Sequence, residues 1–65
     1  MENETSARFL LRLNGYEIGD EPSQIGWRSH RLFKPPMPNV GNYWFETCQQ
    51  ALKFYKEYDP NLRYE

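Results

Sequence analysis

The chain has little cysteine, little histidine and no long apolar run. Its single cysteine, Cys48, cannot close a disulfide within the chain, and no segment has the charge and apolar pattern of a signal peptide. We therefore expect a reducing, cytoplasmic location. No segment approaches the roughly 18 consecutive apolar residues of a membrane-spanning helix, so we expect no membrane partner.

The scarcity of reactive groups also argues against catalysis. His30 is the one histidine, and the sequence ties it to no nucleophile and orienting acid. A metal site needs three or four ligands, whereas His30 and Cys48 fall on different predicted elements without companion ligands. The glycines are dispersed, so no glycine-rich phosphate loop is expected. We expect a non-enzymatic protein without metal or cofactor.

Opposite charges nearly cancel, with 8 Lys and Arg against 9 Asp and Glu and a net charge of -1. The chain thus lacks the basic surplus that is typical of DNA-binding domains, and any electrostatic function must be local. With 65 residues it has room for one core at most, and we expect marginal stability. The aromatic content of 17% offsets this in part, because rings bury large areas.

The first part of the chain predicts two strands. Residues 1–7 are polar and without period, so we expect a disordered N-terminus. Apolar and polar residues alternate over 8–13, which indicates a strand. Asn14-Gly15 then favours a tight type I′ hairpin turn into a second strand at 16–18. The alternation places three apolar side chains on one face of the first strand: Phe9, Leu11 and Leu13.

A third strand is predicted farther along the chain. Residues 19–24 have the composition of a loop, and alternation resumes over 25–34. Ser29 and Arg31 fall on the apolar face of this strand, which favours a bulge near them. The proline-rich segment 34–42 is expected to be a stiff connector, because prolines remove backbone donors and restrict their neighbours.

One helix is predicted near the C-terminus. Residues 42–58 carry an apolar stripe at helical spacing, which a sheet or a partner must cover. The helix begins after Asn42 or after Thr47, and we favour the second because Thr47 and Gln50 match a capping box. The residue before Pro60 should end the helix. The stripe consists of Trp44, Cys48, Ala51, Leu52, Tyr55 and Tyr58.

Together these elements predict a single α+β domain over residues 8–65. We expect a three-stranded antiparallel meander with the C-terminal helix packed on one face, in the order β-β-β-α. Three strands followed by a helix entered through FETCQQALKFY resemble the integrase arm-binding and AP2-type DNA-binding domains, which lay the sheet in the major groove. The resemblance covers roughly residues 8–58. Its local motif is an aromatic residue, any residue and Thr, followed by Ala51 and another aromatic residue. The chain departs from those families in lacking their typical basic charge.

Two groups of residues are candidate binding surfaces. The polar face of the predicted sheet is either a solvated face or a patch that holds phosphates, nucleic acid or an acidic protein surface. The chain also has more rings than so small a core can bury, and surplus Tyr and Trp often anchor interfaces. The basic face comprises Arg8, Arg12, Arg28, His30 and Lys34. The aromatic surface comprises Tyr43, Phe54 and Tyr58.

These patterns favour a small, non-enzymatic regulatory or adaptor protein that binds another protein or a second copy of itself. The near-neutral charge, the surplus of rings and a core small enough to gain stability from association support this interpretation. The alternative is a nucleic-acid-binding module that uses the basic face of the sheet, which the clustered basic positions support.

Overall fold

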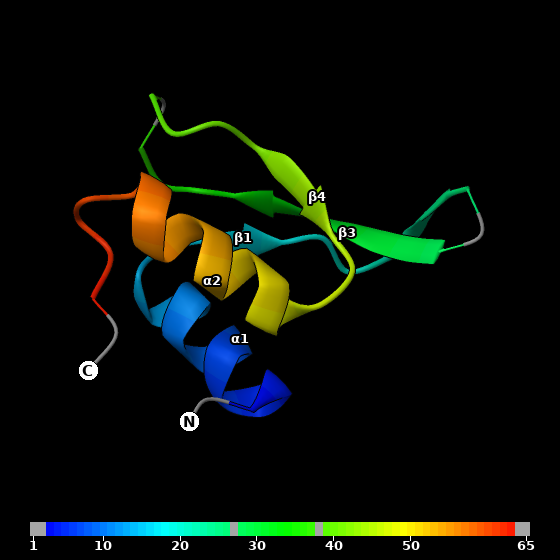
Figure 1. Ribbon diagram of the computed structural model, residues 1–65, viewed down its shortest axis with the longest axis horizontal. Coiled ribbons are helices and arrows are strands. Elements are labelled where there is room, and N and C mark those ends of the chain that lie inside the picture. Colours follow the sequence, from blue (N-terminus) through cyan, green and yellow to red (C-terminus); the bar gives the residue numbers. More distant parts are fainter. Residues whose placement is uncertain (1–2, 27, 38, 64–65) are drawn as a thin grey trace.

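Two helices cover one face of a four-stranded antiparallel sheet (Figure 1). The computed structural model describes residues 3–26, 28–37 and 39–63. The architecture is α+β with an antiparallel sheet, as expected, but a helix precedes the strands. The elements in chain order are α1 (Glu4–Leu13), β1 (Glu17–Ile18), β2 (Ser23–Ile25), β3 (Arg28–Lys34), β4 (Tyr43–Phe45) and α2 (Cys48–Tyr58).

The sheet is organised around β3, which bonds to the other three strands. Phe33 of β3 lies between Ile18 of β1 and Tyr43 of β4, so these two strands occupy opposite edges of β3. Side chains alternate along a strand, and Ile18 and Phe33 are buried beneath the helices. Leu32 and its partner Trp44 therefore face away from the helices.

Helix α1 replaces the disorder expected from residue 4 onward and the strand expected over 8–13, so both predictions are wrong. Asn3 caps this helix, because its side-chain oxygen accepts a hydrogen bond from the N–H of Ser6 at 2.8 Å. The β-β-β-α order and the resemblance to sheet-based DNA-binding domains both relied on a first strand here. That strand is absent from the described residues.

The apolar residues of α1 satisfy a helical period as well as an alternating one, which is the source of the error. Ala7 and Leu11 lie one turn apart on the same side of the helix and are both fully buried. Phe9 and Leu13, expected on the same apolar face as Leu11, are 64% and 70% exposed. The burial pattern therefore follows the helix.

Asn14-Gly15 ends α1 and does not form the predicted hairpin turn. Gly15 has a φ of +89°, and its N–H bonds to the carbonyl of Arg12 at 3.0 Å. The N–H of Tyr16 reaches back to the carbonyl of Leu11 at 3.0 Å. These two bonds form a Schellman motif, in which glycine supplies the positive φ that ends a helix. The same dipeptide thus satisfies a helix end as readily as a hairpin.

The predicted second and third strands are found with changed limits and partners. The strand expected at 16–18 is β1, which pairs with β3 and not with 8–13. The strand expected at 25–34 is β3 from residue 28 onward, preceded by β2, which occupies part of the expected loop. Trp27 lies outside the described residues, as do the side chains of Ile25 and Arg28.

The bulge expected near Ser29 and Arg31 is not in β3. Ile18 is paired with Phe33, and Ser23 is paired with His30. Residues 19–22 therefore lie opposite only residues 31 and 32 of β3, so the extra residues belong to the facing segment. The Arg31 side chain uses this excursion, because its guanidinium donates to the carbonyl of Gly19 at 2.9 Å and to that of Asp20. A basic side chain on the helix-facing side of the strand is thereby satisfied.

Helix α2 confirms most of the prediction for residues 42–58. Thr47 is the N-cap, accepting a hydrogen bond from the N–H of Gln50 at 3.1 Å, and the helix ends at Tyr58. Four stripe residues are buried as expected: Cys48, Ala51, Leu52 and Tyr55. Trp44 is the exception at one end because it belongs to β4, and Tyr58 is the exception at the other because it is 60% exposed.

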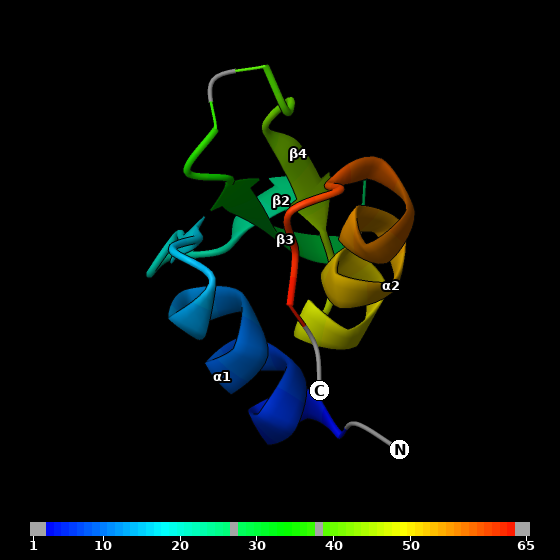
Figure 2. The ribbon, with the colours of Figure 1, turned by 90° about the vertical axis from the view of Figure 1, so that its left-hand side faces the viewer.

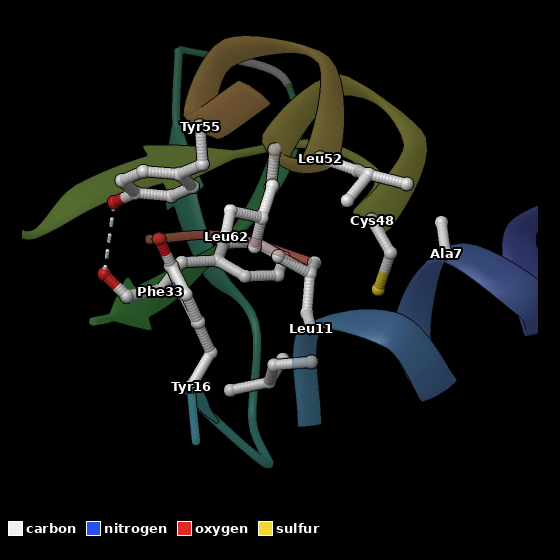
Figure 3. Close-up of a cluster of buried hydrophobic side chains, with 10 residues drawn as sticks. Ala7, Leu11, Tyr16, Phe33, Cys48, Leu52, Tyr55 and Leu62 are labelled. Atoms are coloured by element: carbon white, nitrogen blue, oxygen red, sulfur yellow. Dashed lines mark hydrogen bonds between the residues drawn. The ribbon is translucent and has the colours of Figure 1, made fainter. Parts of the chain in front are cut away.

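The core lies between the two helices and the sheet (Figures 2 and 3). Tyr55 of α2 sits above Phe33, and its hydroxyl donates to the carbonyls of Gly41 at 3.0 Å and Phe33 at 3.4 Å. Burial is the largest of several effects that raise the pKa of Tyr55 to about 12, so the phenol stays neutral. The largest fully buried side chains are Tyr55, Phe33, Leu11 and Leu52.

Two polar contacts fasten the C-terminal ends of the helices. The hydroxyl of Tyr16 donates to a carboxylate oxygen of buried Asp59 at 2.5 Å, and burial together with this bond raises the pKa of Tyr16. The side chain of Asn14 donates to the carbonyl of Arg63 at 2.7 Å and accepts from its N–H at 2.8 Å. The segment after α2 is thus held against α1, with Leu62 in the core.

The contrast between Leu11 and Leu13 tests the helix directly. Leu11→Ala should lower the free energy of unfolding by about 2–5 kcal/mol, because it empties a fully buried site. Leu13→Ala, at a 70% exposed site, should change it by no more than about 0.5 kcal/mol. Urea denaturation followed by circular dichroism measures both. Equal losses would support the alternating strand and contradict α1.

Candidate interaction surface

The residues predicted to form a basic sheet face do not share one face. Arg8 and Arg12 lie in α1, on the helical side of the molecule, so their grouping with the sheet is wrong. His30 and Lys34 lie in β3 and alternate with buried Phe33, which places them on the face away from the helices. The Arg28 backbone continues this strand, and its side chain is outside the described part of the chain.

The three residues predicted as an aromatic surface lie in contact with one another. The ring centroids of Tyr43 and Phe54 are 4.9 Å apart in an edge-to-face arrangement. Those of Phe54 and Tyr58 are 4.2 Å apart and nearly parallel, at 15°. Tyr43 is 44% exposed and Tyr58 60% exposed, while Phe54 between them is partly buried. The surface is therefore continuous and open to solvent.

Local structure explains why these rings meet. Phe54 and Tyr58 are four residues apart in α2, so they lie one above the other on the same side of the helix. Tyr43 and Phe45 occupy alternate positions of β4 and both face α2, while Trp44 points to the opposite face. Phe45 extends the group, with its centroid 5.2 Å from that of Phe54.

A hollow of about 400 Å³ opens beside the aromatic surface. Phe45 and Phe54 give it an apolar floor, and the polar side chains come from successive turns of α2. Lys53 and Glu57 supply one positive and one negative charge at its rim. The hollow is lined by Phe45, Gln50, Lys53, Phe54 and Glu57.

The amino terminus of α2 is held by a residue that the sequence analysis placed in a disordered segment. The Glu4 carboxylate of α1 accepts hydrogen bonds from the N–H of Cys48 at 2.7 Å and of Gln49 at 3.2 Å. Glu4 also lies in the first turn of its own helix, so its charge is favourable at two helix N-termini. No local sequence signal reveals this contact, because the partners are 44 and 45 residues apart.

The contact with α2 changes the acidity of both side chains. Partial burial acts to raise the pKa of Glu4, but the hydrogen bonds from Cys48 and Gln49 and the charge of Arg8 together lower it. Burial and the neighbouring Glu4 carboxylate raise the pKa of the Cys48 thiol to about 12. Cys48 is 3% exposed and belongs to the core, so it acts as a small hydrophobic residue on the apolar stripe that the sequence predicted.

A second hollow, of about 530 Å³, is lined largely by the connector that precedes β4 and has a mostly polar lining. Lys34 of the predicted basic face lines it together with Glu17, the residue opposite in the ladder. Opposite charges at paired positions reduce the local positive potential. The hollow is lined by Gly15, Glu17, Lys34, Pro35, Pro36, Met37, Val40, Gly41 and Asn42.

Two further observations concern other kinds of site. Within the described residues, no group of three or more His, Cys, Asp or Glu side chains is placed to hold a metal ion. None of the helices formed by those residues has the length and apolar character needed to traverse a lipid bilayer. Comparisons with protein-family models, with curated proteins and with solved structures found no match to this chain.

Glu4→Gln tests the contact between the helices. Above pH 6 the change should lower the free energy of unfolding by about 1 kcal/mol. This value lies in the lower part of the range for helix caps, because solvent weakens the interactions of an exposed carboxylate such as Glu4. Since folding lowers the pKa of Glu4 from its ordinary value of 4.5, the carboxylate contributes above that value. The contribution should disappear as the pH falls through the lower folded-state pKa.

Urea denaturation at a series of pH values measures this loss. Glu21→Gln removes the same charge at an exposed position and serves as the control. A loss for Glu4→Gln that equals the control, or that persists unchanged at pH 2, would contradict a role for the carboxylate at α2.

Proposed function

We propose that this chain is a small, non-enzymatic regulatory or adaptor protein that binds another protein or a second copy of itself through the aromatic surface. The observation that carries the proposal is the continuous contact of Tyr43, Phe54 and Tyr58 at a place where the two outer rings remain 44% and 60% exposed. Rings that are held rigidly by one another lose little side-chain entropy when a partner covers them. They also offer much apolar area for burial.

The position of the rings supports a binding role over a purely structural one. Among the described residues, neither outer ring belongs to the buried core cluster, in which Tyr55 is fully buried. Tyr58 stacks on Phe54 and is 60% exposed. An exposed ring beside an apolar hollow with a polar rim matches the general form of a protein interface, in which an apolar centre is surrounded by polar groups.

Nucleic-acid binding by the sheet is the second candidate function. Trp44 is 43% exposed on the face away from the helices, which is the face that His30 and Lys34 share. An exposed ring beside basic positions is the combination that binds single-stranded nucleic acids, by stacking on bases and contacting phosphates. This candidate is the weaker of the two, because Lys34 lies opposite the acidic Glu17 in the sheet and the chain has a net charge of -1.

Capture from the native cell extract with a tagged chain tests the proposal. Tyr43→Ser and Tyr58→Ser, each at an exposed ring, should reduce the recovery of a specific bound protein at least about tenfold, because Tyr is enriched among the interface hot spots that contribute about 2 kcal/mol or more. Phe9→Ser is the matched control, since Phe9 is a 64% exposed ring on α1. Quantitative mass spectrometry of the captured proteins gives the readout.

Recovery that survives both tyrosine changes, or that the Phe9 change reduces equally, would contradict the proposal. Salt dependence separates the second candidate from the first. Binding to a single-stranded polyanion that weakens steeply as salt increases, and is lost with Trp44→Ser or Lys34→Glu, would favour nucleic-acid binding by the sheet.

A further inference from the structure

We propose that the partner of the aromatic surface is a second copy of this chain, with the two α2 helices packed antiparallel about a twofold axis. The inference rests on the proposed function and names the occupant of that surface. In a twofold dimer the same patch of each copy meets the other. If one residue contacts a second residue across the interface, the same contact occurs again with the two copies exchanged. A surface suited to this arrangement must be complementary to itself.

The charges at the rim of the hollow have this property. Lys53 and Glu57 are four residues apart on α2, with Phe54 between them, and both line the hollow. Within the part of the chain that the structure describes, neither head group forms a hydrogen bond or an ion pair. An antiparallel α2 pair places Lys53 of each copy beside Glu57 of the other, which gives two equivalent opposite-charge contacts. A parallel pair would place like charges together.

The rings fit the same arrangement. Phe54 follows Lys53 by one residue, and Tyr58 follows Glu57 by one residue. Because the helices run in opposite directions, Phe54 of one copy and Tyr58 of the other are offset by only about 3 Å along the helix axes when Lys53 lies beside Glu57. Phe54 and the hollow beside it therefore lie within reach of Tyr58 of the second copy. Burial of this 60% exposed ring supplies the apolar centre of the interface, and the two charge contacts lie at its edge.

Sedimentation velocity over a concentration series tests the proposal, because the monomer has a mass of only 7.9 kDa and a dimer is well separated from it. Lys53→Glu places two acidic groups together across the axis, and Glu57→Lys places two basic groups together. Each single change should weaken dimerisation at least about tenfold. The double variant Lys53→Glu/Glu57→Lys restores both opposite-charge contacts and should recover the wild-type dimer.

Mixing the two single variants provides a sharper form of the test. A chain with Lys53→Glu presents only acidic groups at the rim, and a chain with Glu57→Lys presents only basic groups. Equal mixtures should form a heterodimer at concentrations at which each variant alone is monomeric. Arg63→Glu and Glu21→Lys make the same charge changes at exposed positions outside α2 and should leave the dimer unchanged. Thermal melting by circular dichroism confirms that each variant is folded.

The possible outcomes separate this inference from the proposed function. Wild-type chain that stays monomeric up to about 1 mM, a double variant that fails to recover the dimer, or single variants that fail to pair when mixed would overturn the inference. If the chain is monomeric but still captures a different protein through Tyr43 and Tyr58, the inference fails and the proposed function stands. If neither association occurs, both fail.

Discussion

The packing of α1 against α2 is the contact on which the rest of the structure depends. Ala7 and Leu11 of α1 lie in one buried cluster with Cys48 and Leu52 of α2, and Figure 3 shows these side chains where the two helices meet. A small side chain at position 7 lets the helices approach closely. Without α1, the buried side of α2 would face water, and a core drawn from a chain of 65 residues has little apolar area to spare.

Polar contacts fix the relative position of the two helices at both of their ends. Glu4 accepts hydrogen bonds from the first turn of α2, while Tyr16 donates to Asp59 just beyond the last turn. Because both ends are held, α2 has a defined rotation about its axis. That rotation decides which side of α2 meets the core and which side carries Phe54 and Tyr58 outward, where β4 adds its own rings. The candidate interaction surface is therefore a consequence of the helix pair.

The sequence predicted α2 well because its signals are local and agree with one another. Thr47 and Gln50 identify the start, the stripe identifies the buried side, and Pro60 limits the end. The sequence identified the three surface rings as surplus aromatic residues but did not predict that they contact one another. The position of Tyr43 depends on the pairing of β4 with β3, which is not a local property of the sequence.

The N-terminal half was predicted less well because each of its signals has two meanings. Leu11 fits alternation together with Leu13 and helical spacing together with Ala7, and Asn14-Gly15 ends a helix as readily as it turns a hairpin. Tertiary contacts decide between these meanings. Leu11 is buried against α2, and Glu4 is bonded to residues more than 40 positions away, which no window along the chain detects. The basic sheet face was lost with the strand that was to carry Arg8 and Arg12.

Nuclear magnetic resonance of the labelled chain tests the helix pair most directly. The account predicts helical Cα chemical shifts throughout Glu4–Leu13 and a nuclear Overhauser effect between the methyl group of Ala7 and the side-chain protons of Cys48. Extended shifts over this segment, with cross-strand effects between Leu11 and Ile18 as a hairpin at Asn14-Gly15 requires, would contradict it.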